Sequence, residues 1–98
     1  MITRVVKMHF RTEEIDTFKA LFDSRKELIR GFEGCEYLEL WQDIDTPEIF
    51  FTYSHWTHTD RLEAYRHSDL FADVWSKTKA LFADRPQAWS VEPQVKLP

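Results

Sequence analysis

The chain has 98 residues, a length that suits one domain and leaves no room for two. Its net charge is −4 and it contains no long basic run, so we expect no nucleic-acid partner. No apolar stretch reaches the roughly 18 residues that a membrane-spanning helix requires, so we expect no membrane partner either. Cys35 is the only cysteine and the N-terminus does not resemble a secretory leader, which together favour a cytoplasmic location.

Aromatic residues make up 15% of the chain, with eight Phe, four Trp and three Tyr. A domain of this size needs only part of that supply for its core. Exposed aromatic surface is unfavourable in a monomer, so we expect the remainder in a ligand cavity or a protein interface.

Hydrophobic spacing predicts a strand over residues 2–10, followed by an amphipathic helix over residues 13–29. Thr12 is the candidate N-cap of this helix, and Gly31 is the candidate residue that ends it. Alternation of polar and apolar residues over 35–42 then predicts a second strand.

In this second strand, the alternation puts Cys35, Tyr37 and Trp41 on one face. A short polar turn leads to a third strand over residues 48–56, so the two strands are predicted to form an antiparallel hairpin.

Residues 57–83 have a helical pattern that is interrupted. Thr59 is the candidate cap of a short first helix, and Ser68 is the candidate cap of the next one. Pro86 ends the helical region, and residues 87–92 are predicted to form the last strand.

The order β-α-β-β-α-β predicts an α+β, ferredoxin-like split βαβ domain over residues 1–92. It would contain one four-stranded antiparallel sheet with the helices on one face, and residues 93–98 would form an extended C-terminal arm. The face without helices would expose several apolar side chains: Val5, Tyr37, Trp41 and Tyr53. We therefore predict a homodimer that packs sheet against sheet.

Five short segments follow one another in a characteristic order. They are Gly-Phe-Glu-Gly-Cys at 31–35, Tyr-Leu-Glu-Leu at 37–40, Phe-Thr-Tyr-Ser-His-Trp at 51–56, Leu-Glu-Ala-Tyr at 62–65 and Ser-Asp-Leu-Phe at 68–71. Over roughly residues 2–92 the chain thereby resembles the antibiotic biosynthesis monooxygenase (ABM) family of the dimeric α+β barrel superfamily. The resemblance implies that two sheets close a barrel in a dimer, with a cleft in each subunit between sheet and helices.

The resemblance also implies what to expect for each catalytic branch of the family. In the heme-degrading branch, the proximal histidine corresponds to Trp75, an asparagine to Val6 and a tryptophan to Tyr65. These departures disfavour heme binding, which therefore ranks third among the functions considered for this chain.

The polyketide-type branch, which oxidises aromatic compounds with O₂ and without metal or flavin, has a tryptophan that matches Trp56. Its asparagine and its helix tyrosine correspond to Thr52 and Leu62. The quinol monooxygenase branch carries histidines where this chain has Tyr65 and Leu70.

The resemblance therefore implies a cofactor-independent monooxygenase that oxidises a small electron-rich aromatic (a quinol, a phenol or an anthrone-like compound) with O₂. Its candidate catalytic residues are Trp56 and Tyr65. The candidate substrate-binding residues are Val6, Met8, Phe10, Phe50, Thr52, Ser54, Phe71 and Trp75. The alternative is a non-catalytic dimeric module of the same fold that binds a small molecule.

No cofactor and no metal are expected. His55 and His58 are three residues apart, but a metal site needs further ligands and none is evident in the sequence. Cys35 lacks a setting that would lower its pKa, so we expect a packed thiol and not a nucleophile.

Overall fold

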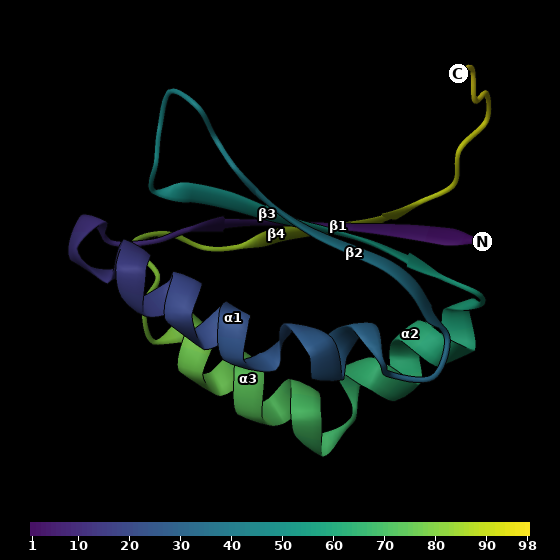
Figure 1. Cartoon of the computed structure of the whole chain (residues 1–98), viewed down its shortest axis with the longest axis horizontal. Coiled ribbons are helices and arrows are strands. Elements are labelled where there is room, and N and C mark those ends of the chain that lie inside the picture. The colour runs from purple at the N-terminus through teal and green to yellow at the C-terminus, as the bar shows by residue number, and fades with distance from the viewer.

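The computed structural model describes all 98 residues and confirms the predicted order of the main elements (Figure 1). The four strands form one antiparallel sheet in the spatial order β2-β3-β1-β4. The elements are β1 (Ile2–His9), the short 3₁₀ turn η1 (Thr12–Glu14), α1 (Ile15–Arg30), β2 (Cys35–Gln42), β3 (Ile49–Trp56), α2 (Thr59–Arg66), α3 (Asp69–Lys79) and β4 (Gln87–Val91).

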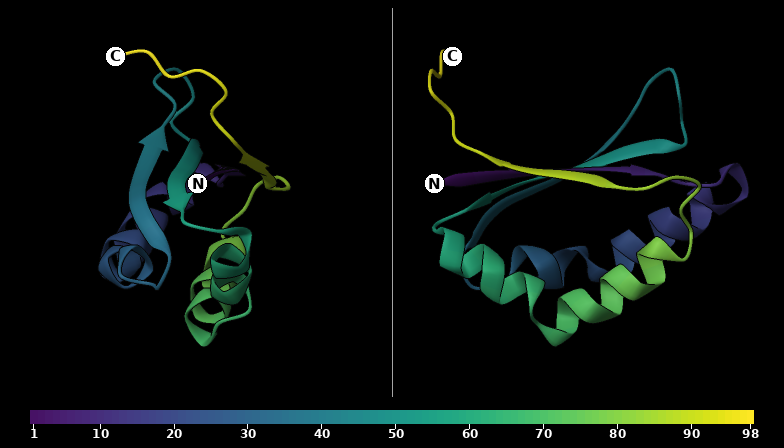
Figure 2. Two further views of the ribbon diagram at one scale, coloured as in Figure 1. Left: turned by 90° about the vertical axis from the view of Figure 1, so that its right-hand side faces the viewer. Right: turned by 180° about the vertical axis from the view of Figure 1, so that it is seen from behind.

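The three α-helices all lie on one face of the sheet, and the other face is left open (Figures 1 and 2). Strands β1 and β3 are central, whereas β2 and β4 are the edges. This is the α+β, ferredoxin-like architecture that the sequence predicts. None of the helices is long and apolar enough to cross a membrane.

The core lies between the sheet and the helices. Met8 and Phe50 are opposite each other in the register of β1 and β3, and both are buried on the helix-covered face. Phe10 is 0% exposed and stacks on Phe18 with 4.1 Å between ring centroids. Phe50 and Phe82 meet Phe10 at 5.8 and 5.3 Å, so this phenylalanine cluster joins strand, helix and loop.

The start of the first helix differs from the prediction. Thr12 does not act as an N-cap, because Thr12–Glu14 forms a 3₁₀ turn and α1 begins after it without a side-chain cap. Arg11 takes the extended position before this turn, and its carbonyl accepts the Glu14 N–H at 2.9 Å. The helix does end at the predicted Gly31, whose φ of −81° is right-handed and does not require glycine.

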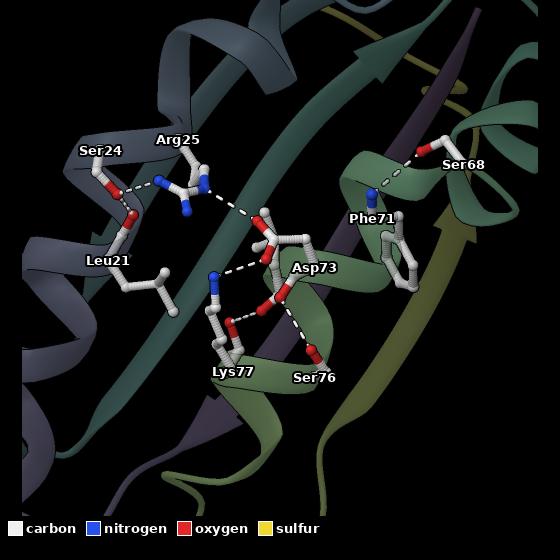
Figure 3. Close-up of polar contacts among 10 residues, drawn as sticks. Leu21, Ser24, Arg25, Ser68, Phe71, Asp73, Ser76 and Lys77 are labelled. Carbon is white, nitrogen blue, oxygen red and sulfur yellow. Dashed lines mark hydrogen bonds and ion pairs between the residues drawn. The ribbon is translucent and has the colours of Figure 1, made fainter.

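The two later helices begin at side-chain caps. The predicted cap Thr59 is wrong, since the His58 imidazole Nδ1 accepts the N–H of Asp60 at 3.1 Å. The predicted cap Ser68 is confirmed, because its Oγ accepts the Phe71 N–H at 3.1 Å (Figure 3).

Helix α3 is fixed beside α1 by charged side chains (Figure 3). Arg25 on α1 donates through Nε to Asp73 Oδ2 at 3.1 Å, and Lys77 Nζ contacts the other carboxylate oxygen at 2.6 Å. Both cations lower the pKa of Asp73, with Lys77 contributing most. Asp73 therefore joins α1 and α3.

Several elements are shorter than predicted. Strand β1 ends at His9, and Phe10 continues only as an isolated bridge to Phe82. Helix α3 ends at Lys79 although its apolar pattern continues beyond that residue, and β4 ends at Val91. Residues 92–98 follow without regular secondary structure.

The predicted face of Cys35 is wrong, because β2 contains a bulge between Cys35 and Tyr37. The extra residue, Glu36, interrupts the alternation. Cys35 is therefore buried among the side chains on the helix-covered face, against Trp56 and Leu62. Tyr37 remains on the open face, where the alternation placed it.

Candidate functional site

A cavity of about 270 Å³ lies between the helix-covered face of the sheet and the helices. Every strand and every α-helix contributes to its lining, which is predominantly hydrophobic. Small-molecule sites typically occupy about 300–1,000 Å³, so this cavity suits a ligand of one or two rings.

The most buried wall of the cavity is a pair of stacked aromatic rings. Trp56 ends β3 and is 1% exposed, and α2 places Tyr65 against it with 5.0 Å between centroids and 27° between planes. Phe32 packs on both rings from the loop after α1. The indole Nε1 donates to Ser54 Oγ at 3.0 Å, so the Ser54 hydroxyl keeps its own proton to donate to a ligand.

The protonation of Tyr65 limits what this residue can do. Burial raises the pKa of the Tyr65 phenol well above its usual range, and the nearby Cys35 thiol acts in the same direction. No hydrogen bond offsets these two effects. Tyr65 is therefore protonated at neutral pH and can donate a hydrogen bond, but it cannot act as a general base.

Helix α3 supplies a second aromatic wall. Phe71 meets Tyr65 edge to face at 5.2 Å, and Trp75 stacks on Phe71 at 5.7 Å with 14° between planes. Phe82 meets Trp75 edge to face, with 5.6 Å between ring centroids and 69° between planes. These contacts fix the orientations of the rings that form this wall.

The structure brings most of the candidate site residues to this one cavity. Two of them, Phe10 and Phe50, lie instead in the phenylalanine cluster of the core, where they are 0% and 1% exposed and do not line the cavity. The candidates that do line it are Val6, Met8, Thr52, Ser54, Trp56, Tyr65, Phe71 and Trp75.

Sequence reasoning missed the charged part of the lining. Arg4 and Arg66 both face the cavity, and Gln87 completes the polar lining from β4. The signal for Arg4 was present, because it shares the alternation face of Val6 and Met8. Arg66 carried no comparable signal, since its role depends on where α2 ends relative to the sheet.

The histidines and the cysteine lie elsewhere, and no histidine, cysteine or carboxylate lines the cavity. His55 Nε2 lies 2.8 Å from the Tyr53 hydroxyl, and its ring stacks on Tyr37. Burial raises the pKa of the Cys35 thiol, so the thiolate is disfavoured. No three His, Cys, Asp or Glu side chains are grouped closely enough to hold a metal ion.

The cavity can therefore orient a planar ring, exclude water from it and donate hydrogen bonds to it. It contains no acid–base pair.

The fold and the cavity together define an α+β, ferredoxin-like domain with an aromatic-lined cavity between sheet and helices. The sequence model described as "Antibiotic biosynthesis monooxygenase" matches residues 1–75, and the chain belongs to this ABM family. Among the curated proteins, none matches the chain.

Solved structures with the same fold cover almost the entire chain. A crystal structure described as an antibiotic biosynthesis monooxygenase has a TM-score of 0.89 and 17% identity, covering 95% of this chain and 98% of its own. Rv0793 from Mycobacterium tuberculosis has a TM-score of 0.88 and 14% identity, covering 99% of this chain and 98% of its own. SnoaB, described as a cofactor-independent oxygenase from Streptomyces nogalater, has a TM-score of 0.88 and 15% identity, covering 99% of this chain and 96% of its own. At these identities the similarity shows a shared fold.

Proposed function

We propose that this protein is a cofactor-independent monooxygenase that oxidises a small electron-rich aromatic with O₂. The observation that carries the proposal is the cavity itself, which is walled by stacked rings and contains hydrogen-bond donors but no metal-ligating group. Family membership supports the reaction class, and one structural neighbour is described as a cofactor-independent oxygenase.

In this chemistry the substrate supplies all the electrons. A hydroquinone that loses its proton can reduce O₂, and one oxygen atom enters the ring while the other leaves as water. For a benzene-1,4-diol, C₆H₄(OH)₂ + O₂ gives C₆H₃(OH)O₂ + H₂O, so atoms and electrons balance without a further reductant. The protein's part is to orient the ring, stabilise the anion and exclude water.

The residues have distinct parts in this proposal. Trp56 and Tyr65 would contact the face or the edge of the substrate ring. The protonated hydroxyl of Tyr65 would donate a hydrogen bond to a developing oxyanion on the substrate. The hydroxyls of Ser54 and Thr52 would fix the ring's orientation. We do not propose heme as a cofactor. The position that corresponds to the proximal histidine of the heme-degrading branch holds Trp75, whose indole ring stacks on Phe71.

A second candidate function is a non-catalytic module that binds a small aromatic. The observation that favours it is the cavity's lack of any carboxylate or histidine that could take the substrate's proton.

Oxygen uptake distinguishes the two functions. We expect purified, metal-free protein to consume O₂ with at least one member of a panel of hydroquinones, phenols and anthrones. The variant Trp56→Phe keeps a buried ring but removes the donor to Ser54, and we expect it to reduce the uptake rate about tenfold or more.

The matched control is Trp41→Phe, which makes the same change on the opposite face of the sheet. Saturable quenching of tryptophan fluorescence by these compounds, without uptake above that of heat-inactivated protein, would instead establish the binding module.

We also propose that the protein is a homodimer formed through the open sheet face. Tyr37, Trp41 and Trp89 on this face are each at least 40% exposed. Glu39 accepts from both the Tyr37 hydroxyl and the Trp41 Nε1, so the polar atoms of these two rings are already paired within the chain. The exposed aromatic surface of this face favours its burial against a second copy.

Sedimentation equilibrium tests the dimer. We expect a mass of twice 11.8 kDa at micromolar concentration. Trp41→Arg places a charge in the face and should shift the mass toward 11.8 kDa, whereas Ile44→Arg in the exposed β2–β3 loop should leave the dimer intact. A wild-type mass of 11.8 kDa would contradict the proposal.

A further inference from the structure

The charge of the cavity is opposite to that of the chain. The chain carries a net charge of −4, yet the only charged side chains that line the cavity are Arg4 and Arg66. Aromatic stacking alone does not require two guanidinium groups. Their presence points to a ligand that is aromatic and also negatively charged.

Arg4 is held in place without an acidic partner. It lies on β1, opposite Ser54 of β3 and Ser90 of β4. Its Nη1 donates to Ser90 Oγ at 3.0 Å, and it forms no ion pair. A guanidinium has five N–H donors, so this bond orients the group and leaves donors for a ligand.

The environment of Arg4 is unfavourable for a cation. Burial lowers the pKa of the Arg4 guanidinium, the positive charge of Arg66 lowers it further, and Glu63 acts in the opposite direction. An anion between the two guanidiniums would relieve both the desolvation and the repulsion.

Arg66 approaches the cavity from the last turn of α2. Its Nη1 contacts Glu63 Oε1 at 2.8 Å, and both side chains are more than two-fifths exposed. Glu63 does not line the cavity. Of the two guanidiniums, Glu63 therefore pairs with that of Arg66 alone, Arg4 has no carboxylate partner, and this end of the cavity keeps a net positive charge.

We infer that the cavity binds its aromatic ligand as an anion, with the ring against Trp56 and Tyr65 and the anionic oxygen at Arg4 and Arg66. The statement that this ligand is the substrate rests on the proposed function. Either an ionised phenol or a carboxylate substituent supplies the required chemistry, because both present a charged oxygen beside a planar ring.

The inference also addresses the missing base. No group of the cavity can accept the proton of a neutral phenol at pH 7, but two guanidiniums favour the ionised form of a bound phenol. The proton then leaves to solvent when the substrate binds, and the anion is ready to reduce O₂.

Two probes that cannot be oxidised at the ring test the anion preference by calorimetry. 2-Naphthoate carries a carboxylate, and 2-naphthalenemethanol has the same ring system but is neutral. We expect naphthoate to bind about tenfold more tightly or better, since a charge-assisted hydrogen bond contributes about one order of magnitude or more in affinity. A third probe, 4-nitrophenol, reports ionisation by its absorbance, and its phenol pKa should fall on binding.

Substitutions then locate the effect. Arg4→Gln and Arg66→Gln should each remove most of the preference for naphthoate and leave the affinity for 2-naphthalenemethanol nearly unchanged. Arg66 is exposed, so its variant should fold even if Arg4→Gln is impaired. Arg61→Gln is the matched control, because Arg61 lies on the same helix, pairs with Glu33 and does not line the cavity.

The inference would be overturned if the two naphthalenes bind with equal affinity, or naphthoate fails to bind, while the nitrophenol pKa is also unchanged. A preference for naphthoate that survives in both variants would overturn it as well. A fall in the nitrophenol pKa without naphthoate preference would assign the anion as a phenolate. Because these measurements record binding and not turnover, their outcomes are independent of oxygen uptake, and failure of the oxygenase proposal would be recognised separately.

Discussion

Replacing Phe10 with alanine will lower the free energy of unfolding by about 3–5 kcal/mol, the range for truncating a fully buried aromatic side chain. Phe10 is 0% exposed and contacts the rings of Phe18, Phe50 and Phe82, which come from three separate parts of the chain. The space it leaves is enclosed by rigid rings, so the surrounding structure can collapse only in part.

Urea unfolding monitored by circular dichroism measures this loss. Ile44→Ala is the control, because Ile44 is 96% exposed in the loop between β2 and β3 and should change stability by less than about 0.5 kcal/mol. A loss below about 1 kcal/mol for Phe10→Ala would mean that the phenylalanine cluster does not stabilise the fold as described.

Replacing Gly34 with alanine will destabilise the protein by about 2–4 kcal/mol, through backbone strain and steric overlap together. Gly34 has a φ of +97°, which L-residues rarely adopt. A Cβ there would lie 2.3 Å from Arg61 Cβ, an atom fixed to the helix backbone. Helix α2 would have to move, and it carries Tyr65 and Arg66.

Gly31→Ala provides the comparison within the same loop. Gly31 has a φ of −81°, and an added Cβ would lie 3.1 Å from the Glu27 carbonyl oxygen and 3.9 Å from that of Leu28. We expect a loss of less than about 1 kcal/mol for this variant. Differential scanning calorimetry of the two variants should therefore give clearly different melting temperatures, and equal values would contradict the argument.

The sequence predicted the layout of the fold because its hydrophobic periods are regular. The apolar spacing of α1 and the alternation of β1 and β3 persist over several turns or residue pairs, and tertiary packing reinforces both patterns. Single residues at the ends of elements were less predictable. Thr12 lies two residues before Glu14, the N-cap position of α1, because a 3₁₀ turn precedes that helix. Thr59 lies one residue after the cap of α2, because the His58 imidazole accepts the Asp60 N–H.

The bulge in β2 had no sequence signal. One extra residue changes the face of Cys35, and neither composition nor spacing reveals an insertion of that kind. The site was predictable where strand alternation decided it, as for Thr52 and Ser54. The alternation of β1 also carried a signal for Arg4, whereas Arg66 was not predictable, because its position at the cavity depends on how α2 meets the sheet in the tertiary structure.

The edge position of β4 has a consequence for how the cavity exchanges its contents. All five residues of this strand are exposed, and its backbone is bonded only to β1, yet Gln87 and Ala88 form part of the cavity wall. Breaking one ladder of hydrogen bonds costs far less than global unfolding. We therefore expect the amide hydrogens of β4 to exchange with solvent before those of the central strand β3, and a molecule filling the cavity to slow that exchange.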